Sequence, residues 1–256
     1  MRTWLTVAQG LAIAYAALCL WLYFTQRSQI YFPAPESNPP GARSIRVATG
    51  GAMLKVWVVE RAGPRALIYF GGNAEDVSGS LPSFESAFPD HSLYLVNYRG
   101  YGGSSGKPSE SALFVDATAV YDHVHVRHPE ISVLGRSLGS GVAVHLASVR
   151  EIRRLVLVTP YDSLVNVART HFPLFPVALL IRDRYDSASR ARRTSAPVLA
   201  VIAGDDEIIP RARSDALVSA FPESRIQVTV LEGATHNSLD IFPGYLRAVS
   251  NFLAVD

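Results

Sequence analysis

Apolar residues form one uninterrupted block near the N-terminus and then recur as short runs along the rest of the chain. The block from Trp4 to Phe24 has 21 residues and no charged side chain. A helix needs about 20 such residues to cross a bilayer. Aromatic side chains lie at both ends of the block, as they do at membrane interfaces. We therefore predict an N-terminal transmembrane helix, with residues 1–28 as a membrane anchor and residues 29–256 as one further domain.

Two other interpretations of this block stay open, a cleaved signal peptide and a buried helix. The apolar region of a signal peptide is usually about 7–15 residues long and ends before a small-residue cleavage site, whereas this block is longer and ends in aromatic residues. Arg2 and the amino terminus precede the block, and Arg27 follows it. By the positive-inside rule, this difference favours a single-pass protein whose N-terminus is cytoplasmic and whose domain is not.

After a proline-rich stretch at residues 33–42, which predicts an extended linker or surface loop, short β-rich runs alternate with longer helical stretches. Most runs from residue 66 onward are continuously apolar, which is typical of strands covered on both faces by helices. The pattern predicts an α/β fold, a doubly wound and mostly parallel sheet with an antiparallel edge at its first two strands. Strands are expected over residues 44–48, 55–59, 66–70, 92–97, 131–134, 155–159, 198–203 and 227–231, and helices over residues 111–127, 138–149, 211–221 and 242–252.

Composition and charge narrow the class of protein. Hydrophobic residues make up 48% of the 256 positions and charged residues 18%, below the roughly 25% charged residues of an average chain. Such a chain can bury a large core and is not a disordered segment. The formal net charge of +2 gives no electrostatic basis for nucleic-acid binding. The single cysteine, Cys19, excludes a disulfide framework and a multi-cysteine metal site.

A G-x-S-x-G motif at residues 135–139 places Ser137 between an apolar strand and a helix rich in small residues. In this strand–turn–helix setting the motif presents a nucleophilic serine above the edge of a sheet. The flanking positions need glycine because a side chain there would clash at the tight strand–helix crossing. The alternative interpretation is an ordinary turn between a strand and a helix.

A serine hydroxyl is a weak nucleophile unless a histidine accepts its proton and a carboxylate orients that histidine. In enzymes with this motif the histidine follows the serine in the chain. His145 lies two turns into the helix after Ser137, and His171 has no strand before it. His236 follows the run QVTVL in a glycine-containing loop, at the strand ends where active sites of α/β sheets gather. The sequence therefore favours His236 as the base.

The acid should also follow a strand, and three acidic residues, Asp205, Asp206 and Glu207, come directly after the run VLAVIAG. Residues 206–210, with the sequence DEIIP, resemble the D-x-[IV]-[IV]-P turn of the α/β-hydrolase superfamily. In that turn the aspartate is the acid of the catalytic triad. The resemblance implies Asp206 as the acid, with Asp205 as the alternative.

Acyl transfer builds negative charge on a carbonyl oxygen, and fixed N–H donors stabilise it. One donor should be the backbone N–H of Leu138, and another should come from the loop after an early strand. Residues 71–75, GGNAE, resemble the H-G-N-A oxyanion loop of membrane-anchored abhydrolase-domain proteins, with Gly71 where histidine is common. The resemblance implies the backbone N–H of Asn73 as the second donor. A flexible glycine-rich turn is the alternative interpretation.

Further segments are similar to the same branch of hydrolases, and together they span about residues 29–240: residues 29–33, 97–102, 159–164 and 233–237. The resemblance implies a serine hydrolase that cleaves carboxylic esters or thioesters, of the lipid or acyl-protein type, without a metal or an organic cofactor. Its partners would be a lipid-like or membrane-presented acyl ester or thioester and the lipid bilayer, with no nucleic acid. The alternatives are an aminopeptidase-like serine peptidase and a noncatalytic membrane scaffold of the same fold.

A small cap-like insert over about residues 160–195 separates two of the predicted strands, where an ordinary crossover needs only a dozen or more residues. It contains an apolar, proline-interrupted stretch at residues 171–181 and then five arginines. One interpretation is a cap whose apolar face lines an acyl-chain groove and whose arginines lie on anionic lipid headgroups. The other is a core-packed helix with a solvated basic face.

Overall fold

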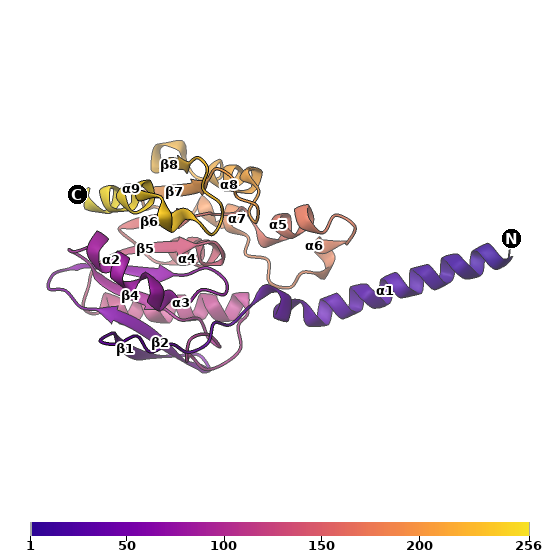
Figure 1. Cartoon of the computed structure of the whole chain (residues 1–256), viewed down its shortest axis with the longest axis horizontal. Coiled ribbons are helices and arrows are strands. Elements are labelled where there is room, and N and C mark those ends of the chain that lie inside the picture. Colours follow the sequence, from indigo (N-terminus) through magenta and orange to yellow (C-terminus); the bar gives the residue numbers. More distant parts are fainter. Residues whose placement is uncertain (1, 256) are drawn as a thin grey trace.

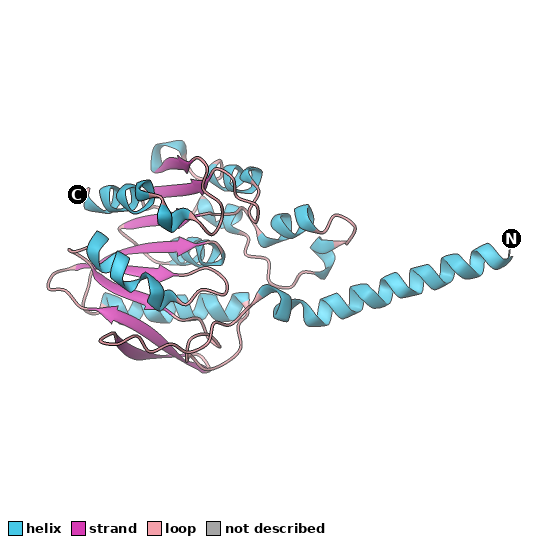
Figure 2. Cartoon of the chain, in the orientation of Figure 1, coloured by secondary structure: helices cyan, strands magenta, loops and turns pink. Residues whose placement is uncertain are grey.

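The computed structural model describes residues 2–255, in which eight strands form one sheet (Figures 1 and 2). In spatial order the strands are β1-β2-β4-β3-β5-β6-β7-β8. β2 runs antiparallel to both β1 and β4, and the other neighbouring strands are parallel. The strands are β1 (Arg43–Thr49), β2 (Ala52–Val59), β3 (Arg65–Phe70), β4 (Ser92–Val96), β5 (Glu130–Arg136), β6 (Arg154–Val158), β7 (Val198–Ala203) and β8 (Ile226–Leu231).

Helices cover both faces of the sheet, as strands with continuous apolar runs require. α3, α4, α7 and α8 bury side chains on one face, and α2 and α9 do so on the other. α1 projects away from the sheet, and α5 and α6 lie near the C-terminal end of α1 (Figure 1). The helices are α1 (Arg2–Ile30), α2 (Leu81–Ala87), α3 (Glu110–His125), α4 (Leu138–Val149), α5 (Leu164–His171), α6 (Val177–Leu180), α7 (Ser187–Ala191), α8 (Arg211–Val218) and α9 (Pro243–Ala254).

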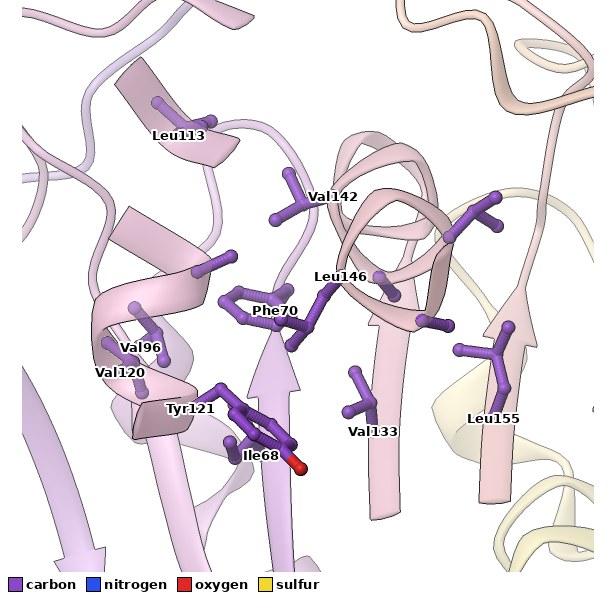
Figure 3. Close-up of a cluster of buried hydrophobic side chains, with 14 of the residues drawn as sticks. Ile68, Phe70, Val96, Leu113, Val120, Tyr121, Val133, Val142, Leu146 and Leu155 are labelled. Carbon is purple, nitrogen blue, oxygen red and sulfur yellow. The ribbon is translucent and has the colours of Figure 1, made fainter. Parts of the chain in front are cut away.

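Side chains of β3 enter two separate cores, because successive residues of a strand point to opposite faces. Ile68 and Phe70 belong to the cluster shared with α3 and α4, whereas Leu67 and Tyr69 belong to the cluster shared with α2 and α9. Figure 3 shows Phe70 beside Leu146 of α4. Burying each such side chain contributes roughly 1.5–3 kcal/mol. The two cores therefore fix the middle of the sheet, from whose carboxyl edge the site is built.

The predicted α/β architecture is confirmed, and so is the antiparallel pairing of the first two strands. Every expected strand and helix is present, with its ends shifted by three residues or fewer. The sequence did not predict α2 or the helices α5, α6 and α7 of the insert. None of these four is longer than eight residues, so none is long enough to show a helical repeat of apolar positions.

α1 is a single helix of 29 residues. Its stretch Thr3–Ile30 reaches a mean hydropathy of 1.8, and its most apolar part is not buried against the rest of the chain. Among the described residues it is the one helix that is long and apolar enough to cross a membrane.

α1 packs on the insert between β6 and β7 from its middle to its end. Tyr15 stacks on Phe175 with ring centres 6.0 Å apart, and the Gln26 amide donates a hydrogen bond of 2.9 Å to the last carbonyl of α6. Two leucines of the insert, Leu174 and Leu179, are nevertheless 82% exposed. The insert therefore uses its apolar side chains partly against α1 and partly at the surface.

Residues 33–42 form a surface loop, which is one of the two alternatives that the sequence left open. The buried Lys55 ammonium donates hydrogen bonds to Glu36 at 3.0 Å and to Asn38 at 2.8 Å. These contacts hold the proline-rich stretch on the edge of the sheet near β2.

Candidate active site

Ser137 lies on the turn between β5 and α4, at the carboxyl edge of the sheet. Its backbone has φ 50° and ψ −116°, a conformation that residues other than glycine rarely adopt and that the surrounding structure must impose. A Cβ on Gly135 would lie 2.6 Å from the Ala143 side chain, and a Cβ on Gly139 would overlap the carbonyl oxygen of Phe70. The two motif glycines therefore permit the tight crossing that turns Ser137 toward a pocket at the sheet edge.

The imidazole of His236 connects Ser137 to a carboxylate. His236 lies in the loop after β8 and is 5% exposed. Its Nε2 lies 2.9 Å from Ser137 Oγ, and its Nδ1 lies 2.9 Å and 3.0 Å from the two carboxylate oxygens of Asp206. Three side chains that are distant in the sequence thus form one hydrogen-bonded chain, with distances short enough for a proton to pass from serine to histidine.

The Asp206 carboxylate follows β7 and is held by the backbone of its own loop. Its Oδ1 accepts hydrogen bonds from the Ile208 N–H at 2.9 Å and from the Ile209 N–H at 2.7 Å. Asp205 is exposed, and within the described part of the chain its carboxylate has no hydrogen bond or ion pair. Of the two aspartates that the sequence left open, the structure brings Asp206 to His236.

The other two histidines that follow Ser137 lie elsewhere. His145 stacks on Phe114 of α3 with ring centres 3.8 Å apart, and burial lowers its pKa to about 4. His171 Nε2 lies 2.8 Å from the carbonyl oxygen of Ile208. His236 is therefore the one of the three that is hydrogen-bonded to the serine.

The loop of residues 71–75, which follows β3, borders the serine. A Cβ on Gly72 would lie 3.7 Å from the Cβ of Ser137, so glycine lets this backbone approach the hydroxyl-bearing residue. Asn73 and Ser137 line the same pocket of about 520 Å³. Among the described residues, no hydrogen-bond acceptor is found for the backbone N–H of Asn73 or of Leu138. Neither N–H group is therefore occupied by a partner within the described residues.

Comparison with known proteins identifies the family to which the chain belongs. No family profile matches the chain. The chain is 35% identical, over an alignment of 270 positions that includes gaps, to an uncharacterised protein of Mycobacterium tuberculosis, with 97% of this chain and 94% of the relative covered. It is 28% identical over 241 residues to alpha/beta hydrolase domain-containing protein 17C of Xenopus tropicalis, with 91% and 76% covered. In structure it is similar to an esterase from Pyrococcus furiosus, with a TM-score of 0.73, 17% identity, and 88% and 98% covered. The chain belongs to the α/β-hydrolase superfamily, in its abhydrolase-domain branch.

The superfamily predicted from the sequence motifs is thus confirmed. Membership of this family supports the assignment of the chain as a hydrolase. At 17% identity the structural likeness carries the fold alone. The fold alone does not determine which bond this α/β-hydrolase cleaves; the residues of its own site do.

Two charged side chains, Glu75 and Arg136, line the pocket of this α/β-hydrolase. Glu75 accepts hydrogen bonds of 2.6 Å from the Gly72 N–H and from the Tyr69 hydroxyl. Burial raises the pKa of Tyr69, and the Glu75 carboxylate raises it further, so Tyr69 stays a donor. Arg136 Nη1 lies 3.9 Å from a carboxylate oxygen of Glu75 and 3.3 Å from one of Asp240, so it offsets part of the negative charge of these two residues. In the sequence, the role of Glu75 is indicated only by its place three residues after Gly72, where a carboxylate can accept from the N–H groups of a tight turn.

Proposed function

We propose that this α/β-hydrolase is a membrane-tethered serine hydrolase that cleaves carboxylic esters or thioesters, of the lipid or acyl-protein type, through an acyl-enzyme. The observation that carries the proposal is the chain of hydrogen bonds from Ser137 Oγ through His236 to Asp206. Such a catalytic group is recognised by its geometry and not by sequence position.

Acylation begins when Ser137 Oγ attacks the acyl carbonyl carbon while His236 Nε2 takes the hydroxyl proton. Asp206 keeps a proton on Nδ1, so Nε2 is free to accept, and its charge stabilises the imidazolium that forms. The carbonyl oxygen becomes an oxyanion, which the N–H groups of Asn73 and Leu138 stabilise. Collapse of this intermediate breaks the bond to the alcohol or thiol, which leaves with the proton from His236.

Deacylation follows the same path with water. His236 takes a proton from water as the water oxygen attacks the acyl-enzyme carbonyl, and the same two N–H groups stabilise the second oxyanion. When the bond to Ser137 Oγ breaks, the serine recovers its proton from His236 and the carboxylic acid leaves. These steps need no metal or organic cofactor.

An apolar groove beside the catalytic pocket supports an acyl-chain substrate. The groove of about 210 Å³ lies between α1 and the insert and is lined by apolar side chains that include Leu22, Ile30, Ala168, Phe172, Phe175 and Leu180. Ile30 of the groove is two residues from Phe32 of the pocket, and His171, which precedes the groove residue Phe172 in the chain, contacts the Ile208 carbonyl of the pocket. Because one wall belongs to a helix that can cross a membrane, we expect the acyl chain of a membrane substrate to occupy this groove.

The tether in this proposal is α1. Its length and hydropathy suit a membrane-crossing helix, and the exposed Leu174 and Leu179 of the insert suit contact with lipid. The charges around the helix, Arg2 and the amino terminus against Arg27, favour a catalytic domain outside the cytoplasm. The amino group of Met1 lies outside the described residues.

Labelling of the purified full-length protein in detergent with a fluorophosphonate probe tests the reaction. We expect labelling of the wild type and of the control Ser148→Ala, a serine on the same helix α4 whose hydroxyl donates to the His145 carbonyl. Ser137→Ala should not be labelled, and His236→Ala should lose ester and thioester turnover. An unlabelled wild type would favour a noncatalytic scaffold, and faster cleavage of amino-terminal peptide bonds than of esters would favour a peptidase.

A chain-length series of esters and thioesters tests the groove. Ala168→Phe places a ring in the groove, so kcat/KM for long acyl chains should fall at least roughly tenfold while acetyl substrates are unaffected. Ala178→Phe adds the same ring to α6 at a position that does not line the groove, and it should keep the wild-type profile. Equal losses on short and long chains would argue against an acyl chain in the groove.

A further inference from the structure

The chain leaving α1, residues 27–32, is fixed to the insert on one side. We call these residues the exit segment. Arg27 donates hydrogen bonds of 2.9 Å and 3.0 Å to the Asp183 carboxylate, and the Tyr31 hydroxyl donates to the same carboxylate at 3.1 Å. Asp183 is 3% exposed and the Arg27 side chain is 41% exposed, so salt screens this ion pair in part, whereas the bond from the Tyr31 hydroxyl is buried. One side of the exit segment is therefore held firmly.

On its other side the exit segment is bound by the side chain of Asn73. Asn73 Nδ2 donates a hydrogen bond of 2.7 Å to the Ile30 carbonyl, and Asn73 Oδ1 accepts one of 3.0 Å from the Phe32 N–H. The Ile30 carbonyl is among the last four of an α-helix, which lack partners within the helix. A single amide side chain thus pairs with a donor and an acceptor of the exit backbone, as a neighbouring strand would.

The same amide oxygen also organises the 71–75 loop. Asn73 Oδ1 accepts from the Tyr101 hydroxyl at 2.8 Å and from the Ala74 N–H at 3.1 Å. Ala74 has a φ of 60°, a left-handed conformation that is strained for alanine and persists only where its surroundings impose it. The side chain of Asn73 therefore shapes the loop that borders Ser137 and that carries its own backbone N–H.

We propose that the Asn73 side chain is a positioning residue that couples the exit of the N-terminal helix to the oxyanion donor on its own backbone. The proposal rests on the function proposed above, in which the Asn73 N–H stabilises the oxyanion. A shift of α1 relative to the domain moves the Ile30 carbonyl and the Phe32 N–H, and Asn73 passes that shift to the loop beside Ser137. Hydrolysis is then fastest when the exit segment is docked.

Asn73→Ala removes both amide contacts and keeps the backbone N–H. Full-length wild type and variant are compared in detergent, with rates divided by the fraction of Ser137 that a fluorophosphonate probe labels at completion. For an oxygen ester we expect kcat to fall about 10–100-fold with KM nearly unchanged, which is part of the roughly 100–1000-fold cost of deleting an oxyanion donor. For the matching thionoester the loss should be several-fold smaller, because sulfur is a weak hydrogen-bond acceptor.

Hydrogen exchange gives a second measurement that does not depend on hydrolysis. In Asn73→Ala the Phe32 amide loses its bond to Asn73, so a peptide covering residues 27–34 should exchange about tenfold faster while peptides of β5 are unchanged. Asn38→Ala is the matched control, because Asn38 accepts from Lys55 and contacts neither the exit segment nor the 71–75 loop. Its rates and its exchange should equal those of the wild type.

Equal losses on the oxygen ester and the thionoester would overturn the proposal, because they would show that Asn73 does not position the oxyanion donor. Unchanged exchange in the exit segment would overturn it as well. If the wild type hydrolyses neither ester, the proposed function itself fails. A failure of the coupling alone leaves wild-type turnover intact, so the two failures are distinguishable.

Discussion

Replacing Asp206 by asparagine tests which aspartate orients the catalytic histidine. The Asp206 carboxylate lies 2.9–3.0 Å from His236 Nδ1 and accepts from the Ile208 and Ile209 N–H groups at 2.9 Å and 2.7 Å. An asparagine keeps the backbone bonds through its amide oxygen, but its NH₂ group then faces Nδ1. This favours the tautomer with the proton on Nε2, which cannot accept the proton of Ser137.

Because the geometry is that of a catalytic triad, the expected loss of kcat can be taken from the same change in a serine protease. In a serine protease triad the same change lowers kcat about 10⁴-fold, which equals about 5.4 kcal/mol of transition-state stabilisation. The free energy of unfolding should change by less than about 1 kcal/mol, because both backbone bonds of the loop persist. Asp205→Asn is the matched control, since that side chain is exposed and its replacement should keep kcat within about twofold.

The assay is hydrolysis of short-chain p-nitrophenyl esters by the full-length protein in detergent, with active sites counted by fluorophosphonate labelling and stability measured by urea unfolding. A loss of less than about tenfold in Asp206→Asn, or an equal loss in Asp205→Asn, would refute the assignment. A fall in the free energy of unfolding as large as the catalytic loss would show that Asp206 supports the fold and does not act through His236.

Three further predictions concern stability. Gly139→Ala should lower the free energy of unfolding by about 1–3 kcal/mol, because its Cβ would overlap a carbonyl oxygen of β3. Gly79→Ala is the control, since the new Cβ has open space around it and should leave the free energy of unfolding unchanged. Urea unfolding measures both variants. Burial lowers the pKa of His145 to about 4, so the unfolded chain binds more protons than the native protein between about pH 6.5 and 4. Stability should fall as the pH decreases through that window, and His145→Phe should flatten the decline in thermal unfolding. Arg99→Met leaves the buried Asp116 carboxylate unpaired and should cost about 3–5 kcal/mol in urea unfolding, most of which the double variant with Asp116→Leu should recover.

Hydrophobic patterning locates the strands of this protein because most of them are buried on both faces. The run VLAVIA coincides with β7 (Val198–Ala203), in which every residue is buried. The order of the strands does not follow from such runs: β4 lies between β2 and β3, and this arrangement depends on how helices from distant parts of the chain pack on the sheet. The insert is similar, because its contacts with α1 join residues more than 150 positions apart.

Residues of the candidate site could be found from sequence where each comes directly after a strand, since parallel strands end at one edge. Ser137 and His236 fit that rule. The choice between Asp205 and Asp206 depends on which carboxylate the loop turns inward, and the backbone N–H groups that bind Asp206 decide it. The second role of Asn73 depends on contacts with residues 41 and 43 positions earlier, so no local pattern indicates it.

The length of α1 has a consequence for how such a hydrolase would meet its substrate. Its 29 residues at about 1.5 Å each extend roughly 44 Å, but Tyr15, at the middle of the helix, contacts Leu174 and Phe175 of the insert, so the insert would lie at the depth of the lipid if α1 spanned the bilayer. A helix that enters the bilayer and leads without a linker into the catalytic pocket holds that pocket at a constant depth relative to the lipid. The search for substrate is then two-dimensional, and the depth of the scissile bond in the membrane becomes a criterion of selection. Turnover would follow the surface density of substrate and not its concentration in solution.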